Sequence, residues 1–175
     1  MKVILVDGYN VIRSTGMYAD LAEDGFTGGT GLNAAREALI ADVAVMAQGE
    51  ADATVVFDAY GNAESEGNTV ERAGIKVIYS PSGISADSTI EQLARQARER
   101  GDEVLVVTSD AQTQWAVMGD GVTRMSSAGF CREVARVNES WREKNPEYPT
   151  KNTLAERIDP KTAARLAALL HPKDD

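Results

Sequence analysis

Cysteine and histidine are almost absent from this chain, which has 175 residues and one of each, Cys131 and His171. A single cysteine cannot form an intramolecular disulfide or supply a cysteine-rich zinc site, so disulfide frameworks and zinc fingers are excluded. A single histidine argues against a histidine-centred mechanism. Any chemistry on this chain therefore depends on carboxylates, hydroxyls, amides or a bound metal ion.

Long apolar runs and excess positive charge are also missing. The first apolar run stops at Asp7 after a few residues, far short of the roughly 20 that cross a bilayer. We therefore expect a cytoplasmic protein with no membrane partner. The 18 Lys and Arg residues against 27 Asp and Glu give a net charge of −9. A nucleic-acid ligand would thus need a local basic patch or a bridging metal rather than a broad basic face.

Short β-branched runs alternate with amphipathic segments along the chain. The runs predict strands at 2–6, 53–57, 75–79 and 103–108, with a weaker one at 122–125. The segments between them predict helices at 32–48, 87–100, 111–118 and 130–144. Continuous apolar runs are typical of strands buried on both faces, and this alternation is typical of parallel sheets. We expect an α/β fold of three layers, α/β/α, around a central, mainly parallel sheet.

The character of the sequence changes near residue 145. Beyond it, prolines punctuate a polar stretch that leads to a last predicted helix at 160–170, which starts with a proline, as first helical turns often do. We expect residues 1–145 to form one domain, and residues 146–175 to form a C-terminal helical appendage that is not an independent domain.

Acidic residues gather where the predicted strands end. They follow the first, second and fourth strands, and they open the helix after the third strand: Asp7, Asp58, Asp110, Asp87 and Glu91. Parallel strands end at one edge of a sheet, where ligands bind, so these side chains are expected to converge. Two carboxylates about 5 Å apart repel by about 3 kcal/mol at an effective dielectric of 20, so the cluster needs protons or a cation. Oxygen ligands alone favour Mg²⁺ or Mn²⁺, and phosphodiester hydrolysis is the natural use of such an ion.

Each acid also has a purely structural alternative. Asp7 and Asp58 precede turn-forming residues, and Asp87 could cap its helix. The spacing at 88–91 and at 109–112 matches a capping box, which offers the same alternative for the other two acids. The functional interpretation depends on the coincidence of all of them at one edge.

Three further residues could contact a substrate near this edge. Asn10 could hold a water molecule or a phosphate oxygen, or it could simply cap a turn; Arg13 and Arg124 could bind a phosphate, or they could be solvated surface charges. The first strand leads into Asp-Gly-Tyr-Asn rather than into a glycine-rich fingerprint, so no dinucleotide cofactor is expected.

Several motifs in register resemble a known family. They are Val-Asp-Gly-Tyr-Asn-Val-Ile at 6–12, Val-Val-Phe-Asp-Ala at 55–59, and the segments at 85–91, 107–116, 124–127 and 132–134. Over roughly residues 1–140 the chain resembles the YacP-like branch of NYN domains, in the PIN-like nuclease superfamily. Scattered motifs in the correct order are far more specific than one short pattern.

This resemblance implies a PIN-like fold and a Mg²⁺- or Mn²⁺-dependent endoribonuclease that cuts mRNA in association with the ribosome. By position, it implies that Asp7, Asp87 and Asp110 are the catalytic metal ligands, with Asp58 and Asn10 in support. The chain departs from the family pattern at Thr113, where relatives carry a glutamate. If that glutamate helps to hold the metal ion in relatives, then either the metal affinity of this chain is lower or Glu91 substitutes as a ligand.

The leading hypothesis is therefore a metal-dependent endoribonuclease in which Arg13 or Arg124 steadies the phosphate. A second hypothesis is a non-catalytic RNA- or ribosome-binding adaptor, motivated by the acidic balance and by Thr113. A third is a structure-specific DNA nuclease or a phosphatase that uses the same acidic edge.

Overall fold

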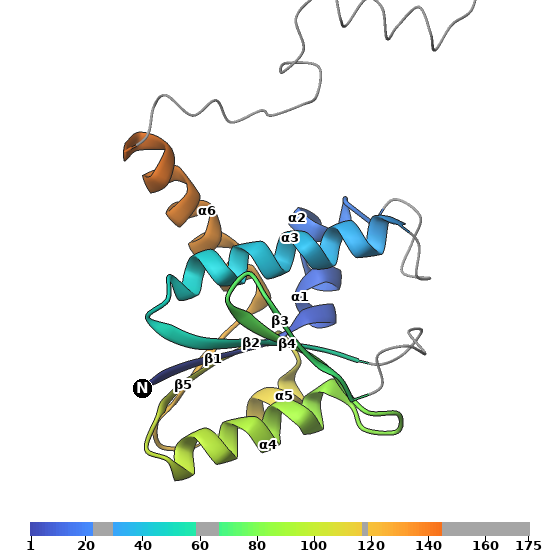
Figure 1. Ribbon diagram of the computed structural model, residues 1–175, viewed down its shortest axis with the longest axis vertical. Helices are drawn as coiled ribbons and strands as arrows, with labels where there is room; N and C mark the ends of the chain where they lie inside the picture. The colour runs from blue at the N-terminus through green and yellow to red at the C-terminus, as the bar shows by residue number, and fades with distance from the viewer. Residues whose placement is uncertain (23–29, 59–66, 117–118, 145–175) are drawn as a thin grey trace, which may run out of the picture. The chain divides into compact units, whose positions relative to one another are not determined.

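The computed structural model describes residues 1–22, 30–58, 67–116 and 119–144 (Figure 1). The chain divides into two compact units, Met1–Arg136 and Val137–Asp175, and the candidate site lies in the first. The helix predicted at 160–170 and the appendage at 146–175 lie outside the described residues, so both stay predictions. Within the described part, no helix is long and apolar enough to cross a membrane.

A mainly parallel sheet forms the centre of the first unit, as predicted. Its strands within the described residues are β1 (Lys2–Asp7), β2 (Ala51–Phe57), β3 (Thr69–Arg72), β4 (Ile75–Tyr79), β5 (Glu103–Val107) and β6 (Val122–Met125). Their order across the sheet is β3-β4-β2-β1-β5-β6. Every neighbouring pair is parallel except β3 and β4.

The antiparallel strand β3 is a feature that the sequence analysis missed. All four of its residues are exposed at the edge of the sheet, so it has no buried apolar run to reveal it. It joins β4 through Ala73 and Gly74, which have φ values of 50° and 78°. A two-residue connection with positive φ at both positions is typical of a tight β-hairpin. The glycine before the apolar run at Ile75 was therefore the available sequence signal.

The helices are α1 (Gly8–Ser14), α2 (Gly16–Ala19), α3 (Thr30–Ala47), α4 (Ala86–Glu99), α5 (Ala111–Ala116) and α6 (Ser127–Lys144). The last four match the predicted helices with boundaries shifted by up to three residues, while the end of the segment predicted at 111–118 lies outside the described residues. The short helices α1 and α2 were not predicted. A turn after Asp7 was the structural alternative to a functional role, and the chain instead enters α1 directly.

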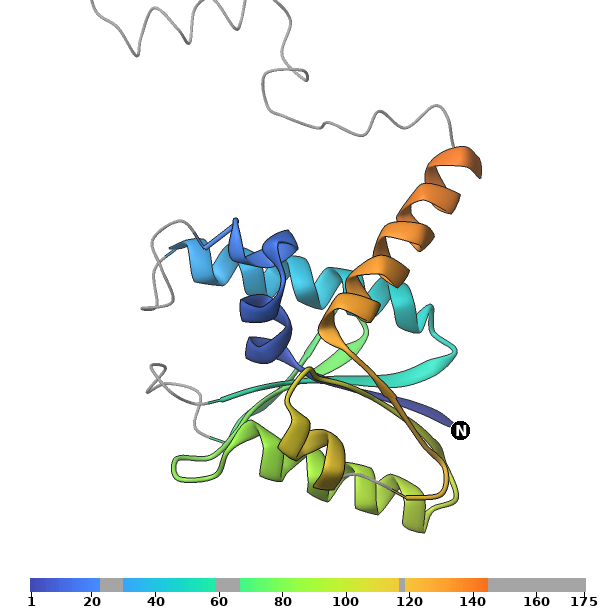
Figure 2. The ribbon, with the colours of Figure 1, turned by 180° about the vertical axis from the view of Figure 1, so that it is seen from behind.

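Helices cover both faces of the sheet and make the three layers expected. Figures 1 and 2 show α1, α2 and α3 on one side, and α4 with α5 on the other. On β1, Ile4 and Val6 belong to the core cluster that includes α3, whereas Val3 and Leu5 belong to the cluster under α4. Burial on both faces explains why this strand is a continuous apolar run.

The strand order places a switch point at the carboxyl end of β1. The chain leaves β1 for β2 on one side, and later returns to the opposite side of β1 as β5. Connections therefore diverge around β1, and a crevice outside its carboxyl end is the usual ligand site of such sheets. The last residue of β1 is Asp7.

Candidate functional site

Asp7 lies at the carboxyl end of β1 and is only 7% exposed. Its carboxylate caps α1, since Oδ1 accepts a hydrogen bond from the Asn10 N–H at 3.1 Å. Its Oδ2 accepts a bond from the Thr108 hydroxyl at 3.3 Å. The pKa of Asp7 is raised from 3.8 to about 6, mainly by burial. The charges of Asp87 and Asp110 contribute to this rise, and the two hydrogen bonds oppose it. The three aspartates are therefore close enough to affect one another.

Asp110 follows β5 and caps α5, because its Oδ1 accepts from the Thr113 N–H at 3.0 Å. Its own N–H donates to the Thr108 hydroxyl oxygen at 3.1 Å. Thr108 is fully buried and thus links the Asp7 side chain to the Asp110 backbone. Asp110 is thus itself the N-cap of α5, which begins immediately after it.

Asp87 lies in the first turn of α4, whose N-cap is Ser85. The Ser85 hydroxyl oxygen accepts from the Ser88 N–H at 3.1 Å. Neither Asp87 nor Ser88 is therefore the cap, which excludes the alternative of a capping box at 88–91. Asp87 Oδ1 instead accepts from the Thr113 hydroxyl. The carboxylate thus turns toward α5 rather than toward its own backbone.

All three carboxylates lie at helix N-termini, those of α1, α4 and α5. The N-terminal end of a helix dipole stabilises a negative charge by about 0.3–1 kcal/mol. The dipoles therefore offset part of the mutual repulsion. After burial, the charges of Asp87 and Asp110 still contribute to the raised pKa of Asp7, so the offset is incomplete.

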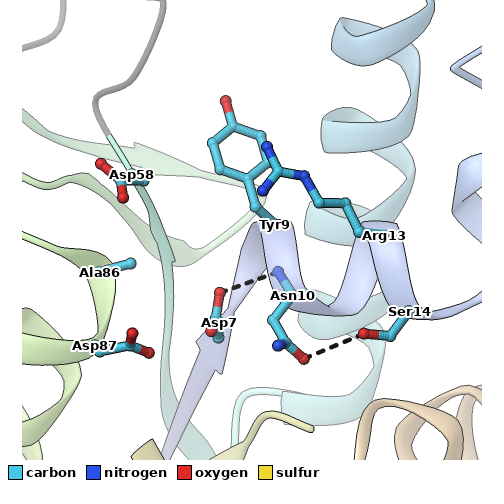
Figure 3. Close-up of a pocket in the computed structure, with 8 residues that line it drawn as sticks. All are labelled: Asp7, Tyr9, Asn10, Arg13, Ser14, Asp58, Ala86 and Asp87. Carbon is cyan, nitrogen blue, oxygen red and sulfur yellow. Dashed lines mark hydrogen bonds between the residues drawn. The ribbon is translucent and has the colours of Figure 1, made fainter. Parts of the chain in front are cut away.

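A pocket of about 450 Å³ opens beside Asp7 (Figure 3). Its lining residues come from β1, α1, the end of β2 and the start of α4: Asp7, Tyr9, Asn10, Arg13, Ser14, Asp58, Ala86 and Asp87. In Figure 3 the Arg13 guanidinium lies beside the Tyr9 ring, 5.4 Å from the ring centroid. The pocket therefore combines an acidic wall with a cationic group, the pairing that a metal-bridged phosphate requires.

Asp58 lines the same pocket from the end of β2. Its Oδ1 accepts from the hydroxyl of the buried Ser80 at 3.4 Å. The structure thus brings Asp58 to the same edge as Asp7, on a neighbouring strand.

Asn10 is committed to internal contacts through its amide oxygen. Oδ1 accepts from the Ser109 N–H at 2.8 Å, from the Ser127 hydroxyl at 2.9 Å and from the Ser14 hydroxyl at 3.4 Å. Asn10 therefore joins α1, the end of β5 and the start of α6, a role that neither sequence alternative anticipated.

Glu91 and Arg124 do not line this pocket. Glu91 is exposed on α4, one turn beyond Asp87. Arg124 is exposed on β6, and its Nη1 donates to the Gln114 carbonyl oxygen at 3.4 Å. Asp110 does not line the pocket either, but Thr108 links it to Asp7, and its charge acts on Asp7. No such link joins Glu91 or Arg124 to Asp7 within the described residues.

The donor set fits a hard divalent ion, although it is not a ready-made cage. Within the described ranges, no group of three acidic, histidine or cysteine side chains is arranged to hold a metal ion. Magnesium usually keeps several water ligands and uses only one or two carboxylates together with substrate phosphate oxygens. Asp7, Asp87 and Asp110 present only oxygen ligands, and their mutual repulsion would be relieved by a cation. Their chemistry therefore suits Mg²⁺ or Mn²⁺.

The sequence did not predict that hydroxyl residues would connect the acids. Thr108, Ser109, Thr113 and Ser127 supply hydroxyls or N–H groups to Asp7, Asn10, Asp87 or Asp110. The hydroxyl residue that ends the apolar run at 103–108 is the one sequence signal that could have identified this role. The others come together only in the tertiary structure.

Comparisons with known proteins agree with the geometry. The family model for the YacP-like NYN domain matches residues 4–171, which extends beyond the motifs noted above. The uncharacterised protein YacP of Bacillus subtilis (strain 168) is 32% identical over 138 residues, covering 78% of this chain and 77% of that protein. Two crystal structures of Rae1 (YacP) from Bacillus subtilis, one of them a variant, match with a TM-score of 0.67 and 27% identity. Both matches cover 97% of this chain, and they cover 99% and 89% of the respective structures.

Proposed function

This chain belongs to the YacP-like NYN domain family of PIN-like nucleases, and on that premise we propose that it is a metal-dependent endoribonuclease. The proposed reaction is hydrolysis of RNA phosphodiester bonds. The observation that carries the proposal is the convergence of three carboxylates from separate elements, since the charges of Asp87 and Asp110 both raise the pKa of Asp7.

The proposed roles follow from where each residue lies. Asp7, Asp87 and Asp110 are the catalytic residues that would hold Mg²⁺ or Mn²⁺, while Asp58 would support the acidic wall of the pocket. Asn10 would act by positioning, because its amide oxygen is used internally. When bound, the ion supplies activation of the attacking water and neutralisation of charge on the phosphoryl group.

Arg13 is the proposed phosphate-binding residue. Its exposed side chain lines the pocket beside the acids, so its guanidinium can bind a phosphate oxygen of the substrate strand by a charge-assisted hydrogen bond. Arg124 and Glu91 lie outside this pocket. If either contacts the substrate, it would do so outside the pocket. In-line attack by water would leave a 5′-phosphate and a 3′-hydroxyl.

The proposed substrate is mRNA on the ribosome. Support comes from the family resemblance and from the net charge of −9, which opposes unaided association with a polyanion. A partner that presents the RNA strand to the pocket would overcome this repulsion. Ribosomes supply both the strand and a large binding surface.

The test is cleavage of a labelled RNA by the purified chain in Mg²⁺ or Mn²⁺, with and without EDTA. We expect EDTA to abolish cleavage, and Asp7→Asn to lower kcat by at least about a hundredfold, the scale of one lost electrostatic group in an active site. Asp52→Asn is the matched control, because Asp52 lies near the amino end of β2 and pairs with Lys76 at 2.9 Å. Cleavage that survives both EDTA and Asp7→Asn would refute the mechanism.

A non-catalytic adaptor gives a different pattern. The unmodified chain and the Asp7→Asn variant would then co-sediment equally well with ribosomes. Neither protein would cut RNA at any metal concentration. DNA flaps and phosphomonoesters, tested beside RNA, would reveal a structure-specific nuclease or a phosphatase.

A further inference from the structure

Thr113 is a buried polar residue on α5 that donates hydrogen bonds to two different acids. The residue is only 1% exposed. Its N–H donates to Asp110 Oδ1 at 3.0 Å, and its hydroxyl donates to Asp87 Oδ1. The hydroxyl oxygen also lies 3.3 Å from Asp110 Oδ1. One residue therefore spans two carboxylates that come from different helices.

Asp87 depends on this contact more than the other two acids depend on theirs. Asp7 is held by the Asn10 N–H and the Thr108 hydroxyl, and Asp110 is held by a backbone N–H. Among the residues that the structure describes, the Thr113 hydroxyl is the one hydrogen-bond donor to the Asp87 carboxylate. Ser85 already caps α4, so no cap bond orients Asp87.

The charges of the site give such a donor a physical role. Two carboxylates near one another repel, and an unrestrained side chain in the first turn of a helix would rotate toward water. The Thr113 hydroxyl lies between the two carboxylates, and its hydrogen bond fixes the orientation of the one that accepts it. The buried position of Thr113 holds that hydroxyl in place, because the residue is packed rather than solvated.

We propose that Thr113 is a positioning residue for the metal-binding acids, and that its hydroxyl holds the Asp87 carboxylate beside Asp110 before a divalent ion binds. This inference rests on the proposed function, since it assumes that these acids bind the ion. Groups that orient metal ligands through hydrogen bonds typically account for 10- to 100-fold in metal affinity. The expected effect of losing the Thr113 hydroxyl is of that size.

The experiment is a calorimetric titration of the full chain with Mn²⁺ alone, in the absence of RNA. Thr113→Val removes the hydroxyl and keeps the shape of the side chain, whereas Thr113→Ser keeps the hydroxyl. We expect Thr113→Val to weaken Mn²⁺ binding by about 10- to 100-fold and Thr113→Ser to stay within about threefold of the original chain. Thr89→Val is the matched control on α4, because the Thr89 hydroxyl donates only to the Ser85 carbonyl oxygen at 3.1 Å.

An Asp87→Asn background separates positioning from a general structural role. If the Thr113 hydroxyl acts through Asp87, Thr113→Val should change Mn²⁺ affinity by less than about twofold once Asp87 is already neutral, because effects on one shared interaction are not additive. An equal loss in both backgrounds would refute the proposal. Thr113→Ala serves the same purpose if the valine variant does not fold.

The outcomes also distinguish this inference from the proposed function. If the original chain binds Mn²⁺ and cuts RNA while Thr113→Val binds Mn²⁺ equally well, the inference fails and the nuclease proposal stands. If the serine variant loses affinity like the valine variant, the hydroxyl is not the cause, and the inference also fails. If the original chain neither binds Mn²⁺ nor needs it for cleavage, both proposals fall together.

Discussion

Asn10 and Ser127 lie 117 residues apart in the sequence, and the Ser127 hydroxyl donates a 2.9 Å hydrogen bond to Asn10 Oδ1. The same oxygen accepts from the Ser109 N–H, and the Ser109 hydroxyl oxygen accepts from the Ser127 N–H at 3.0 Å. This closed network joins α1, the end of β5 and the start of α6. Because the Asn10 N–H also donates to Asp7 Oδ1, the network anchors the central residue of the acidic site.

Asn10→Ala should lower the free energy of unfolding by about 1–3 kcal/mol, because it leaves the fully buried Ser127 hydroxyl without its acceptor. Urea denaturation followed by circular dichroism measures the change. Ser14→Ala is the control, since Ser14 is exposed and its bond to Asn10 is 3.4 Å long, so its change should stay within about 0.5 kcal/mol. A loss of less than about 0.5 kcal/mol for Asn10→Ala would contradict the stabilising role of the network.

Asp7→Asn should stabilise the metal-free protein at pH 7.5, although it lowers activity. The pKa of Asp7 is raised by burial from 3.8 to about 6, so the folded state favours the protonated acid. Its contribution to stability is complete below about pH 4 and is lost as the pH rises through about 6. Asparagine removes the charge and keeps an oxygen that can accept from the Asn10 N–H.

The expected gain for Asp7→Asn is about 1–3 kcal/mol at pH 7.5 in EDTA, and it should disappear near pH 4. Urea denaturation at the two pH values measures both quantities. Asp52→Asn should change stability by less than about 1 kcal/mol at either pH, because its ion pair with Lys76 is solvent-exposed. A destabilising Asp7→Asn at pH 7.5 would contradict the burial argument.

Gly8→Ala should be strongly destabilising, because a Cβ at Gly8 would overlap the Phe57 ring. The Phe57 ring is fully buried and packs against the rings of Tyr9 and Tyr79, so it cannot move aside. Overpacking of this kind costs about 1–3 kcal/mol or more. Gly16→Ala is the matched control on α2, where the nearest side-chain atom is 3.8 Å away. Thermal denaturation of the two variants should show a large decrease in Tm for the first alone.

Arg13→Gln should raise KM for RNA by about tenfold or more and leave stability nearly unchanged, because a hydrogen bond to a charged group contributes about 1.5–3 kcal/mol. Arg124→Gln should change KM by less than about twofold, since Arg124 lies outside the pocket and contacts the Gln114 carbonyl oxygen. Steady-state cleavage kinetics compare the two. A larger rise in KM for Arg124→Gln than for Arg13→Gln would indicate that the phosphate binds at β6 rather than at α1.

The parts of the fold that sequence reasoning predicted are those with a strong local pattern. Strands β1, β2 and β5 are buried on both faces, so their apolar runs are continuous, and the amphipathic α4 shows a clear helical stripe. The exposed strand β3 and the short helices α1 and α2 lack such patterns, and all were missed. Their positions depend on neighbours that are distant in the chain.

For the candidate site, the sequence by itself determined which residue types stand at the ends of the parallel strands, and hence that Asp7, Asp58 and Asp110 would share one edge. It determined this because parallel strands all end on the same side. Only the tertiary structure decided that Thr108 and Thr113 link the acids and that Glu91 does not line the pocket. The physical reason is that hydrogen bonds of about 3 Å depend on helix rotation and side-chain rotamers, which the packing of α4 and α5 determines and the linear spacing of residues does not.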